Sequence, residues 1–291
     1  MITDNQTNFV WFSALLKEKY SAEFGRIIEI LTRHHINFDF LKETKDIWCR
    51  DYMPVQLSKK EFVQFRYEPS YLKTEKELLS RSDPKLVNEA NGIHVENSLI
   101  NLDGGNIVRY QNKAMITARV YKENRDTGLT EAEIRDQISK DLHAEVIIIP
   151  EHRGDEIDHA DGYVRFLDDK TILVNELANE YKYWVKGMNQ LRDRYGFKFV
   201  EIPWFTPKKK KNPLSALGIY INFLEVGNLI LLPKFEIEGN RDEDALKKFI
   251  ELYPGKTIEQ VNINDIAEEG GLLNCISWNI KSPNNGLKTS K

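Results

Sequence analysis

Four short segments hold the side chains best suited to covalent chemistry. A cysteine, Cys275, lies in the segment GGLLNCISW at 270–278, and three acidic segments lie far upstream: Trp48-Cys49-Arg50-Asp51, Leu102-Asp103-Gly104-Gly105-Asn106 and Asp158-His159-Ala160-Asp161. A thiolate is a nucleophile, an imidazole carries protons near neutral pH, and carboxylates hold cations. Together these residue types suggest chemistry on a guanidinium group.

Cys275 is the candidate nucleophile. A thiol attacks only as its thiolate, so its pKa must be lowered, and a bound guanidinium or a protonated His159 would lower it. The alternative is a buried apolar cysteine, since free cysteine is among the most buried residue types. The adjacent Gly270-Gly271 pair permits close approach of the backbone to a ligand, which favours the functional interpretation.

His159 is the candidate proton carrier. In an extended chain, His159 and Asp161 at positions i and i+2 would point to the same side, toward one site. The imidazole would protonate a leaving amine and then deprotonate a water, because its pKa lies near neutrality. The alternative is a turn histidine among solvated acids.

Asp51 and Asp161 are the candidate cation ligands. Each carboxylate can accept two parallel hydrogen bonds from a planar guanidinium, so the pair would select both shape and charge. We expect Asp51 at the end of a strand, where Pro54 stops pairing. The alternative for Asp51 is an internal salt bridge with Arg50 or Arg165.

A metal site is a competing interpretation of the acidic region. Imidazole and carboxylate ligands are dense there: His152, Asp155, Asp158, His159 and Asp161. Density alone is weak support, and no His-x-x-x-His pair accompanies it. We therefore predict neither a metal nor an organic cofactor.

Composition sets the class of protein. The 291 residues are 41% hydrophobic and 30% charged, as in a globular protein. A formal net charge of -4 lacks the basic excess of a nucleic-acid binder. No leader or membrane-spanning stretch is evident and there are only two cysteines, so we expect a cytoplasmic protein that binds neither nucleic acid nor membrane. A homodimer is left open.

Periodicity predicts a mixed α/β protein. Hydrophobic spacing and capping signals predict helices at 12–33, 130–142, 176–195 and 242–253. Short apolar runs between turns predict strands at 62–67, 106–110, 114–118, 146–149, 163–167, 171–174, 198–202, 229–232 and 257–261.

A repeat is visible in the candidate site residues. Asp51, Asp103, His159, Asn222 and Cys275 follow one another at intervals of 52, 56, 63 and 53 residues. Five units of this size would fill the chain, and a radial array would bring one loop per unit to a common centre. We therefore expect one closed catalytic domain at 1–280 and a mobile tail at 281–291.

The motifs resemble those of the agmatine deiminase and bacterial-type peptidylarginine deiminase family of guanidino-group-modifying enzymes. Five matches occur in the same order across most of the chain: Trp48-Cys49-Arg50-Asp51 with Pro54, Leu102-Asp103-Gly104-Gly105-Asn106, His159-Ala160-Asp161-Gly162, Tyr220-Ile221-Asn222-Phe223, and Gly270-Gly271 through Cys275. This chain differs from the family pattern at three of the matched sites: it has Asp103 for a glutamate, Asp158 for a glycine and Asn274 for a histidine.

The resemblance implies a fold, an activity and roles. The fold would be a five-bladed α/β propeller in a single domain. Cys275 would attack the guanidinium carbon, His159 would be acid and then base, and Asp103 would orient His159. Asp51 and Asp161 would hold the guanidinium nitrogens, with Asn222 and Trp48 also at the substrate.

The resemblance also implies a reaction. A cofactor-free hydrolase would convert a small cationic guanidino compound, agmatine first, into a ureido product and ammonia through a covalent thiouronium on Cys275. Three alternatives remain: deimination of arginine or peptidyl-arginine, amidino transfer to an amine, and guanidinium binding without turnover.

Overall fold

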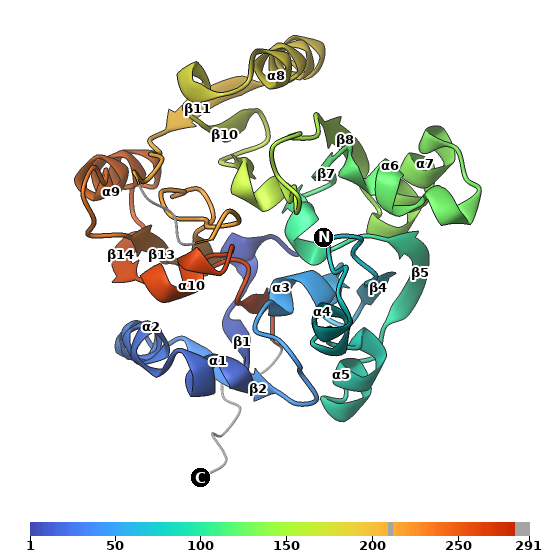
Figure 1. Cartoon of the computed structure of the whole chain (residues 1–291), viewed down its shortest axis with the longest axis horizontal. Coiled ribbons are helices and arrows are strands. Elements are labelled where there is room, and N and C mark those ends of the chain that lie inside the picture. Colours follow the sequence, from blue (N-terminus) through green and yellow to red (C-terminus); the bar gives the residue numbers. More distant parts are fainter. Residues whose placement is uncertain (209–211, 283–291) are drawn as a thin grey trace.

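Five small sheets surround a central axis in the computed structural model, which describes residues 1–208 and 212–282 (Figure 1). Each sheet has three strands. No helix within these described ranges is long and apolar enough to cross a membrane. The predicted tail begins at 281, and its residues 283–291 lie outside the described residues.

Every sheet repeats one topology. An inner strand pairs antiparallel with a middle strand, which pairs parallel with an outer strand. Listed from inner to outer, the five sheets are β3 (Val55–Gln56), β4 (Phe62–Arg66) and β5 (Glu96–Asn101); β6 (Val108–Tyr110), β7 (Lys113–Thr117) and β8 (Glu145–Ile149); β9 (Val164–Phe166), β10 (Thr171–Asn175) and β11 (Lys198–Ile202); β12 (Leu224–Val226), β13 (Leu229–Lys234) and β14 (Thr257–Asn262); and β15 (Trp278–Ile280), β1 (Phe9–Ser13) and β2 (Asn37–Leu41).

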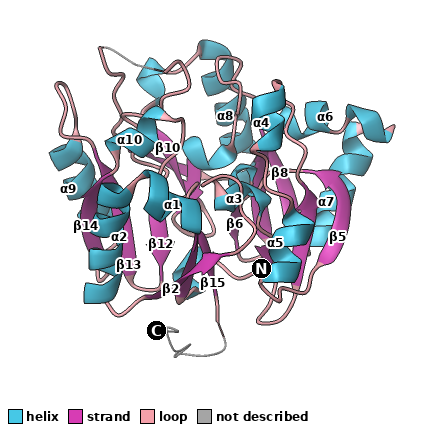
Figure 2. Ribbon diagram, turned by 60° about the horizontal axis from the view of Figure 1, so that its bottom comes forward, coloured by secondary structure: helices cyan, strands magenta, loops and turns pink. Residues whose placement is uncertain are grey.

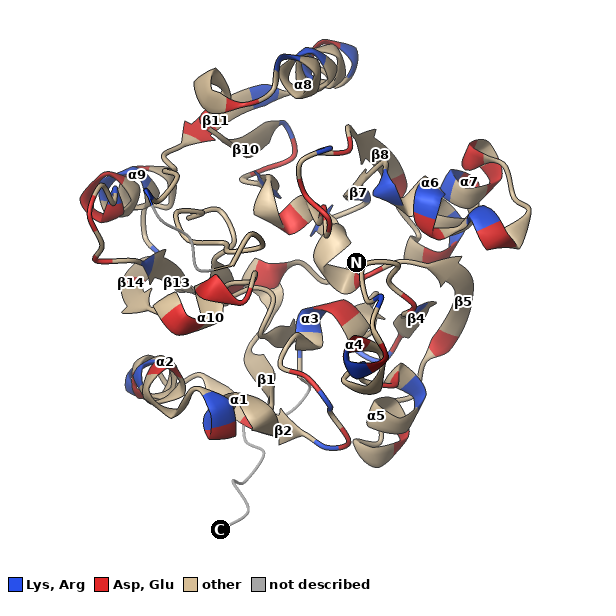
Figure 3. Ribbon diagram, in the orientation of Figure 1, with Lys and Arg blue, Asp and Glu red and all other residues tan. Residues whose placement is uncertain are grey.

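Helices make the crossovers from middle to outer strands, because parallel neighbours need a long connection. They are α1 (Ala14–Lys19) with α2 (Ser21–Arg33), α4 (Glu75–Leu79) with α5 (Pro84–Ala90), α6 (Arg119–Glu123) with α7 (Glu131–Leu142), α8 (Lys182–Tyr195), and α9 (Asp242–Leu252). The helices lie outside the strands (Figure 2), and their exposed faces carry both signs of charge (Figure 3). Two further helices, α3 (Cys49–Tyr52) and α10 (Asn264–Glu268), lie in loops.

Local sequence explains the outer helices. The predicted capping box of α7 is present: Thr130 accepts from the backbone of Glu133, whose side chain accepts from the backbone of Thr130. The amphipathic α8 buries Trp184 and Met188 against its own sheet. Apolar side chains between strands and helices build the core, and one buried cluster is shared by the sheet of β1 and the sheet of β13.

The predicted helix at 12–33 is wrong at its start and in its middle. Phe12 and Ser13 belong to β1, because a short apolar run preceding a helix fits either structure until its pairing partners are known. Ser13 then caps α1 by accepting from Leu15, and Tyr20 breaks the helical path with φ -131° and ψ 54°. The helix predicted from 176 begins at Lys182, after a short 3₁₀ turn at Leu177–Asn179.

A ring of polar side chains lines the axis at the inner strands. The second residue of each inner strand is polar: Gln56, Arg109, Arg165, Glu225 and Asn279. Asp4, in an N-terminal 3₁₀ turn, lies among them. Its carboxylate accepts from Arg165 Nη2 at 2.9 Å, from Arg109 Nη2 at 3.2 Å and from Asn279 Nδ2 at 3.2 Å.

The environment of Asp4 stabilises its ionised form. Burial raises the pKa of Asp4, but the guanidinium groups of Arg165, Arg109 and Arg50 outweigh burial and lower it to about 2. Removing this carboxylate would leave buried cations without their shared partner, which is more costly than losing an exposed ion pair.

We predict that Asp4→Asn lowers the free energy of unfolding at pH 7 by about 3–5 kcal/mol, because it removes one partner of a buried charge network. The stabilisation is present above the unfolded pKa near 4 and is lost as pH falls through about 2, so the difference should shrink on acidification. Urea unfolding of wild type and variant at pH 7 and pH 3 measures this. Asp136→Asn on the exposed face of α7 is the control, and equal losses in both variants would contradict the prediction.

Candidate active site

The five candidate positions meet at one end of the axis. Each lies two to five residues before an inner strand: Asp51 on α3 before β3, Asp103 before β6, His159 before β9, Asn222 before β12 and Cys275 before β15. Asp161 lies in the 3₁₀ turn Ala160–Gly162, directly after His159. The repeating topology therefore brings together residues separated by more than 200 positions in sequence.

His159 lies between two carboxylates. Its Nε2 is 2.9 Å from Asp103 Oδ2, and its Nδ1 is 3.4 Å from Asp51 Oδ1. Burial lowers the pKa of His159, but Asp51, Asp103 and Asp161 outweigh it and raise the pKa to about 10. The neighbouring carboxylates therefore favour the protonated form of the imidazole.

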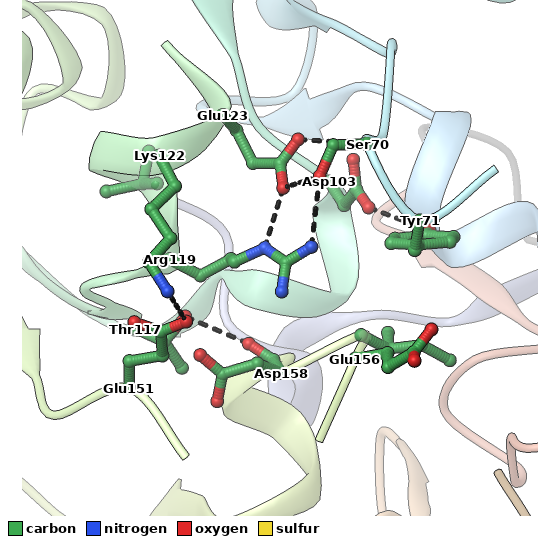
Figure 4. A network of polar contacts seen from close by, with 12 residues as sticks. Ser70, Tyr71, Asp103, Thr117, Arg119, Lys122, Glu123, Glu151, Glu156 and Asp158 are labelled. Carbon is green, nitrogen blue, oxygen red and sulfur yellow. Dashed lines mark hydrogen bonds and ion pairs between the residues drawn. The ribbon is translucent and has the colours of Figure 1, made fainter. Parts of the chain in front are cut away.

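Asp103 reaches His159 despite its short side chain, and a tyrosine holds it there. Tyr71 donates its hydroxyl to the same Asp103 Oδ2 at 2.8 Å, and its ring meets the His159 ring edge to face. The preceding residue, Ser70, is bound through its backbone and hydroxyl to Glu123, which also accepts from Arg119 (Figure 4). Helix α6 thus fixes the loop that carries Tyr71.

Asp51 is buried beside His159. Burial raises the pKa of Asp51 to about 8; the His159 cation opposes this, while Asp103 and Asp161 add to it. The backbone N–H of Gly105 donates to Asp51 Oδ1 at 3.1 Å. A Cβ on Gly105 would lie 2.5 Å from that oxygen and 2.7 Å from His159 Nδ1, so only glycine fits.

Cys275 faces an amide and a carboxylate. Its Sγ lies 3.3 Å from Asn222 Nδ2 and 3.9 Å from Asp161 Oδ2. Burial raises the pKa of the Cys275 thiol well above its usual value, and Asp161 and Asp51 raise it further. Burial and these carboxylates therefore favour the thiol form, and an added cation nearby would favour the thiolate.

Cys49 has a different environment. Its Sγ lies 3.0 Å from the carbonyl of Ile276, and burial raises its pKa well above the usual range. Its side chain is fully buried. Cys49 is therefore a structural residue, whereas Cys275 is the cysteine that lines a cavity.

Trp48 supports the loop that carries Cys275. A Cβ on Gly271 would lie 2.3 Å from the Trp48 ring, so the indole packs directly on the backbone of that loop. Trp48 is not among the described residues that line the cavity in front of Cys275. The predicted contact between Trp48 and substrate stays a prediction.

A cavity of about 590 Å³ opens in front of Cys275, large enough for a small molecule. His159, Asp161, Asn222 and Cys275 line it. The rest of the lining, here called the outer wall, includes aromatic and acidic side chains: Tyr163, Tyr181, Trp204, Asp155, Glu156 and Glu180. None of the described lining residues is a lysine or an arginine.

The residues of the metal interpretation have separate partners. His152 Nε2 is 3.2 Å from Glu180, and Asp155 accepts from Tyr163 at 2.6 Å. His159 is held between Asp51 and Asp103. Across 1–208 and 212–282, the structure contains no group of three or more His, Cys, Asp or Glu placed to hold a metal ion.

The local prediction for Asp51 is wrong, and the alternative weighed for its side chain is not observed. Asp51 lies on α3 and not at a strand end, because Trp48 begins a helical turn that ends at Tyr52 before Pro54. Arg50 and Arg165 do not pair with Asp51: Arg50 donates to Asn279 and to the Asn274 carbonyl, and Arg165 donates to Asp4 and to the Asn274 side chain.

His159 and Asp161 reach the same site by a different backbone path from the one expected. His159 is extended, with φ -85° and ψ 136°, but Asp161 follows in a 3₁₀ turn and not in a strand. Sequence reasoning missed the contacts of Tyr71, since no local signal links it to Asp103, which is 32 residues away. It also missed the acids of the outer wall as a group.

The fold and the site together define a five-bladed α/β propeller with a cysteine, a histidine and several carboxylates at its axis. The model of the Porphyromonas-type peptidyl-arginine deiminase family matches residues 14–280. The chain belongs to this family, whose name denotes hydrolysis of a carbon–nitrogen bond. The resemblance seen in the sequence is thereby confirmed. No curated protein sequence matches the chain significantly.

Solved structures share the fold at low sequence identity. Agmatine deiminase from C. jejuni is 17% identical with a TM-score of 0.76, covering 96% of this chain and 94% of that one. Agmatine deiminase from Enterococcus faecalis is 15% identical with a TM-score of 0.72, covering 97% and 95%. DDAH from Pseudomonas aeruginosa is 13% identical with a TM-score of 0.58, covering 94% and 99%. The predicted fold is confirmed.

Asp158 occupies an unfavourable position next to His159. Its φ of 56° is left-handed, which aspartate tolerates better than most residues other than glycine. Its side chain is fully buried; Oδ1 accepts from His152 N at 2.9 Å, but Oδ2 has no hydrogen-bond partner among the described residues. Burial raises the pKa of Asp158 to about 7, and Asp155 and Glu151 add to the effect.

We predict that Asp158→Asn stabilises the protein at pH 8 by up to roughly 4 kcal/mol relative to wild type, and by much less at pH 4 to 5. The folded pKa is raised above the unfolded value, so the cost of ionisation grows as pH rises from about 4 to 7 and is constant above. Urea unfolding across this range tests the trend, with the exposed Asp193→Asn on α8 as control. A stability difference that does not vary with pH would refute the assignment.

Proposed function

We propose that this protein is a deiminase that hydrolyses the guanidinium group of a small guanidino amine, with agmatine as the leading substrate. One observation carries the proposal: Cys275 faces Asp161, and next to them a buried imidazolium lies between two further carboxylates. This arrangement supplies a nucleophile, an acid and anionic ligands for a planar cation.

Substrate binding would activate the thiol. Asp161 and Asp51 would accept hydrogen bonds from different guanidinium nitrogens, which places the central carbon near Cys275 Sγ. The added positive charge would lower the raised pKa of Cys275 toward neutrality, because a nearby cation favours the thiolate. The thiolate would thus form only when a cationic substrate is present.

The reaction would then proceed in two stages. Cys275 Sγ bonds to the guanidinium carbon, and the carbon–nitrogen bond at Asp51 breaks as His159 Nδ1, which faces Asp51, protonates the leaving ammonia. His159 then takes a proton from a water that attacks the same carbon. The carbon–sulfur bond breaks and releases a ureido product. Asp103 and Tyr71 keep the imidazole in position through both stages.

The outer cavity favours a substrate whose far end is positive. Asp155, Glu156 and Glu180 line it, and the described lining residues include no lysine or arginine to receive a carboxylate. The α-carboxylate of arginine would face these acids, and like charges in close contact cost several kcal/mol. Neighbouring structures support the substrate class, since C. jejuni agmatine deiminase has also been solved with substrate bound.

We expect agmatine to be turned over with a kcat/KM at least about 100-fold higher than that of free arginine, because repulsion of several kcal/mol corresponds to a factor of this size. Ammonia release and ureido-product formation from agmatine, arginine, an arginine-containing peptide and simple guanidines provide the measurement. Added amines would reveal amidino transfer as a new guanidino product. A clear preference for arginine over agmatine would refute the assigned substrate class.

We also expect Cys275→Ala to lower turnover by more than about 10³-fold while leaving the unfolding midpoint close to that of wild type, because the thiol forms the covalent bond. Cys49→Ala is the matched control, and it should keep its turnover once any loss of stability is accounted for. Substrate binding without ammonia release by the wild type would indicate a guanidinium-binding protein. Undiminished turnover in Cys275→Ala would eliminate the nucleophile assignment.

A further inference from the structure

Asn274, immediately before Cys275, is buried and forms hydrogen bonds to four residues from other parts of the ring. Only 4% of the residue is exposed, and it is not among the described residues lining the cavity of Cys275. Its side-chain Nδ2 donates to Asp161 Oδ2 at 2.6 Å, and its Oδ1 accepts from Arg165 Nη1 at 3.2 Å. Its backbone N–H donates to Asn222 Oδ1 at 3.1 Å, and its carbonyl accepts from Arg50 Nε at 3.2 Å.

The Asn274 amide separates a cation from an anion that would otherwise attract each other. Its oxygen faces Arg165 and its nitrogen faces Asp161. A direct Arg165–Asp161 ion pair would consume the negative charge of Asp161, whereas a neutral amide satisfies the carboxylate geometrically and leaves its charge in place. The Asp161 carboxylate is therefore not paired with Arg165 and stays available to a ligand in the cavity.

The Asn274 backbone fixes the orientation of the Asn222 amide. A backbone N–H needs an acceptor, so the Asn222 atom facing it at 3.1 Å is the oxygen. The Asn222 nitrogen is then directed to Cys275 Sγ at 3.3 Å. Asn274 thus positions the Asp161 carboxylate on one side of the Cys275 thiol and the Asn222 amide nitrogen on another side.

The two arginines that donate to Asn274, Arg165 and Arg50, are themselves fixed by further contacts. Arg165 donates to Asp4 at 2.9 Å, and its guanidinium lies over the ring of Phe223, 4.6 Å from the centroid. Arg50 continues to Asn279 at 2.6 Å. The polar ring of the axis therefore anchors both sides of Asn274.

We propose that Asn274 is a positioning residue that keeps Asp161 charged and correctly oriented and directs the Asn222 amide toward the Cys275 thiol. The proposal rests on the proposed function in one respect, that Asp161 receives the substrate guanidinium. Asn274 touches neither the substrate nor the reacting atoms.

The first test is Asn274→Asp, which keeps the shape but replaces the donor to Asp161 with a carboxylate oxygen. Two carboxylates at 2.6 Å cannot both ionise near neutral pH, so they share a proton. The other groups facing this pair are His159 and Arg165 as cations, with Asp51 and the Cys275 thiol. We expect the acid limb of the kcat/KM profile to move up by at least one pH unit, with KM raised at pH 7 and recovering at higher pH.

The second variant, Asn274→Ala, removes both side-chain bonds without adding charge. We expect kcat/KM to fall about 10- to 100-fold, as for the loss of hydrogen bonds to charged groups, with the acid limb moving up by less than in Asn274→Asp because no carboxylate is added. Asn189→Asp on α8 is the matched control: it makes the same charge change, and Asn189 has no side-chain hydrogen bond to a described residue. Its profile should match that of wild type.

A crystal structure of Asn274→Ala separates this proposal from the proposed function. We expect the Asp161 carboxylate to change orientation in it, while the Asn222 amide, held by the Asn274 backbone, keeps its orientation. An unchanged Asp161 carboxylate would overturn the positioning role even if no guanidine is ever turned over. An unmoved acid limb in a folded Asn274→Asp protein would overturn it as well. Absence of turnover in the wild type would refute the deiminase assignment alone.

Discussion

The buried imidazole of His159 stabilises the cluster of carboxylates at the centre of this protein. Asp51, Asp103 and Asp161 are all nearly buried, and carboxylates gathered in a poorly solvated place repel one another and lose hydration. The imidazolium of His159 offsets part of this cost by contacting Asp51 and Asp103 directly. Asp161 adds a third carboxylate next to this single imidazolium, so a further cation would relieve the repulsion among the acids. A guanidinium has the charge and the planar donors to do so.

The axis as a whole separates its charges. Carboxylates gather at the end where the loops precede the inner strands, and guanidinium groups gather around Asp4 at the inner strands themselves. Direct contact between the two sets would cancel the charges that the site needs. Asn274 lies at their boundary and carries hydrogen bonds to both without neutralising either. The arginines around Asp4 therefore form a rigid support, and the carboxylates at the other end of the axis stay available to a ligand.

The sequence could predict that the candidate site residues lie together, because they recur once in each repeating unit of the fold. Asp51, Asp103, His159, Asn222 and Cys275 could be grouped because each precedes an inner strand, so the length of one blade sets their spacing. The start of the first helix was misplaced because Phe12 and Ser13 suit a strand or a helix equally until β2 and β15 pair with β1. The links from Asp4 to Arg165 and from Tyr71 to Asp103 are long-range side-chain contacts, and no local pattern encodes them.

The fifth sheet is built from both ends of the chain. Phe9, Val10 and Trp11 pair with Ile280, Asn279 and Trp278, and Cys275 lies just before that closing strand. Closing it brings together segments separated by nearly the whole sequence, and such contacts form late because their loop entropy must be overcome first. During synthesis, the thiol therefore leaves the ribosome after every group meant to control it. The chemistry proposed for Cys275 therefore requires closure of this sheet.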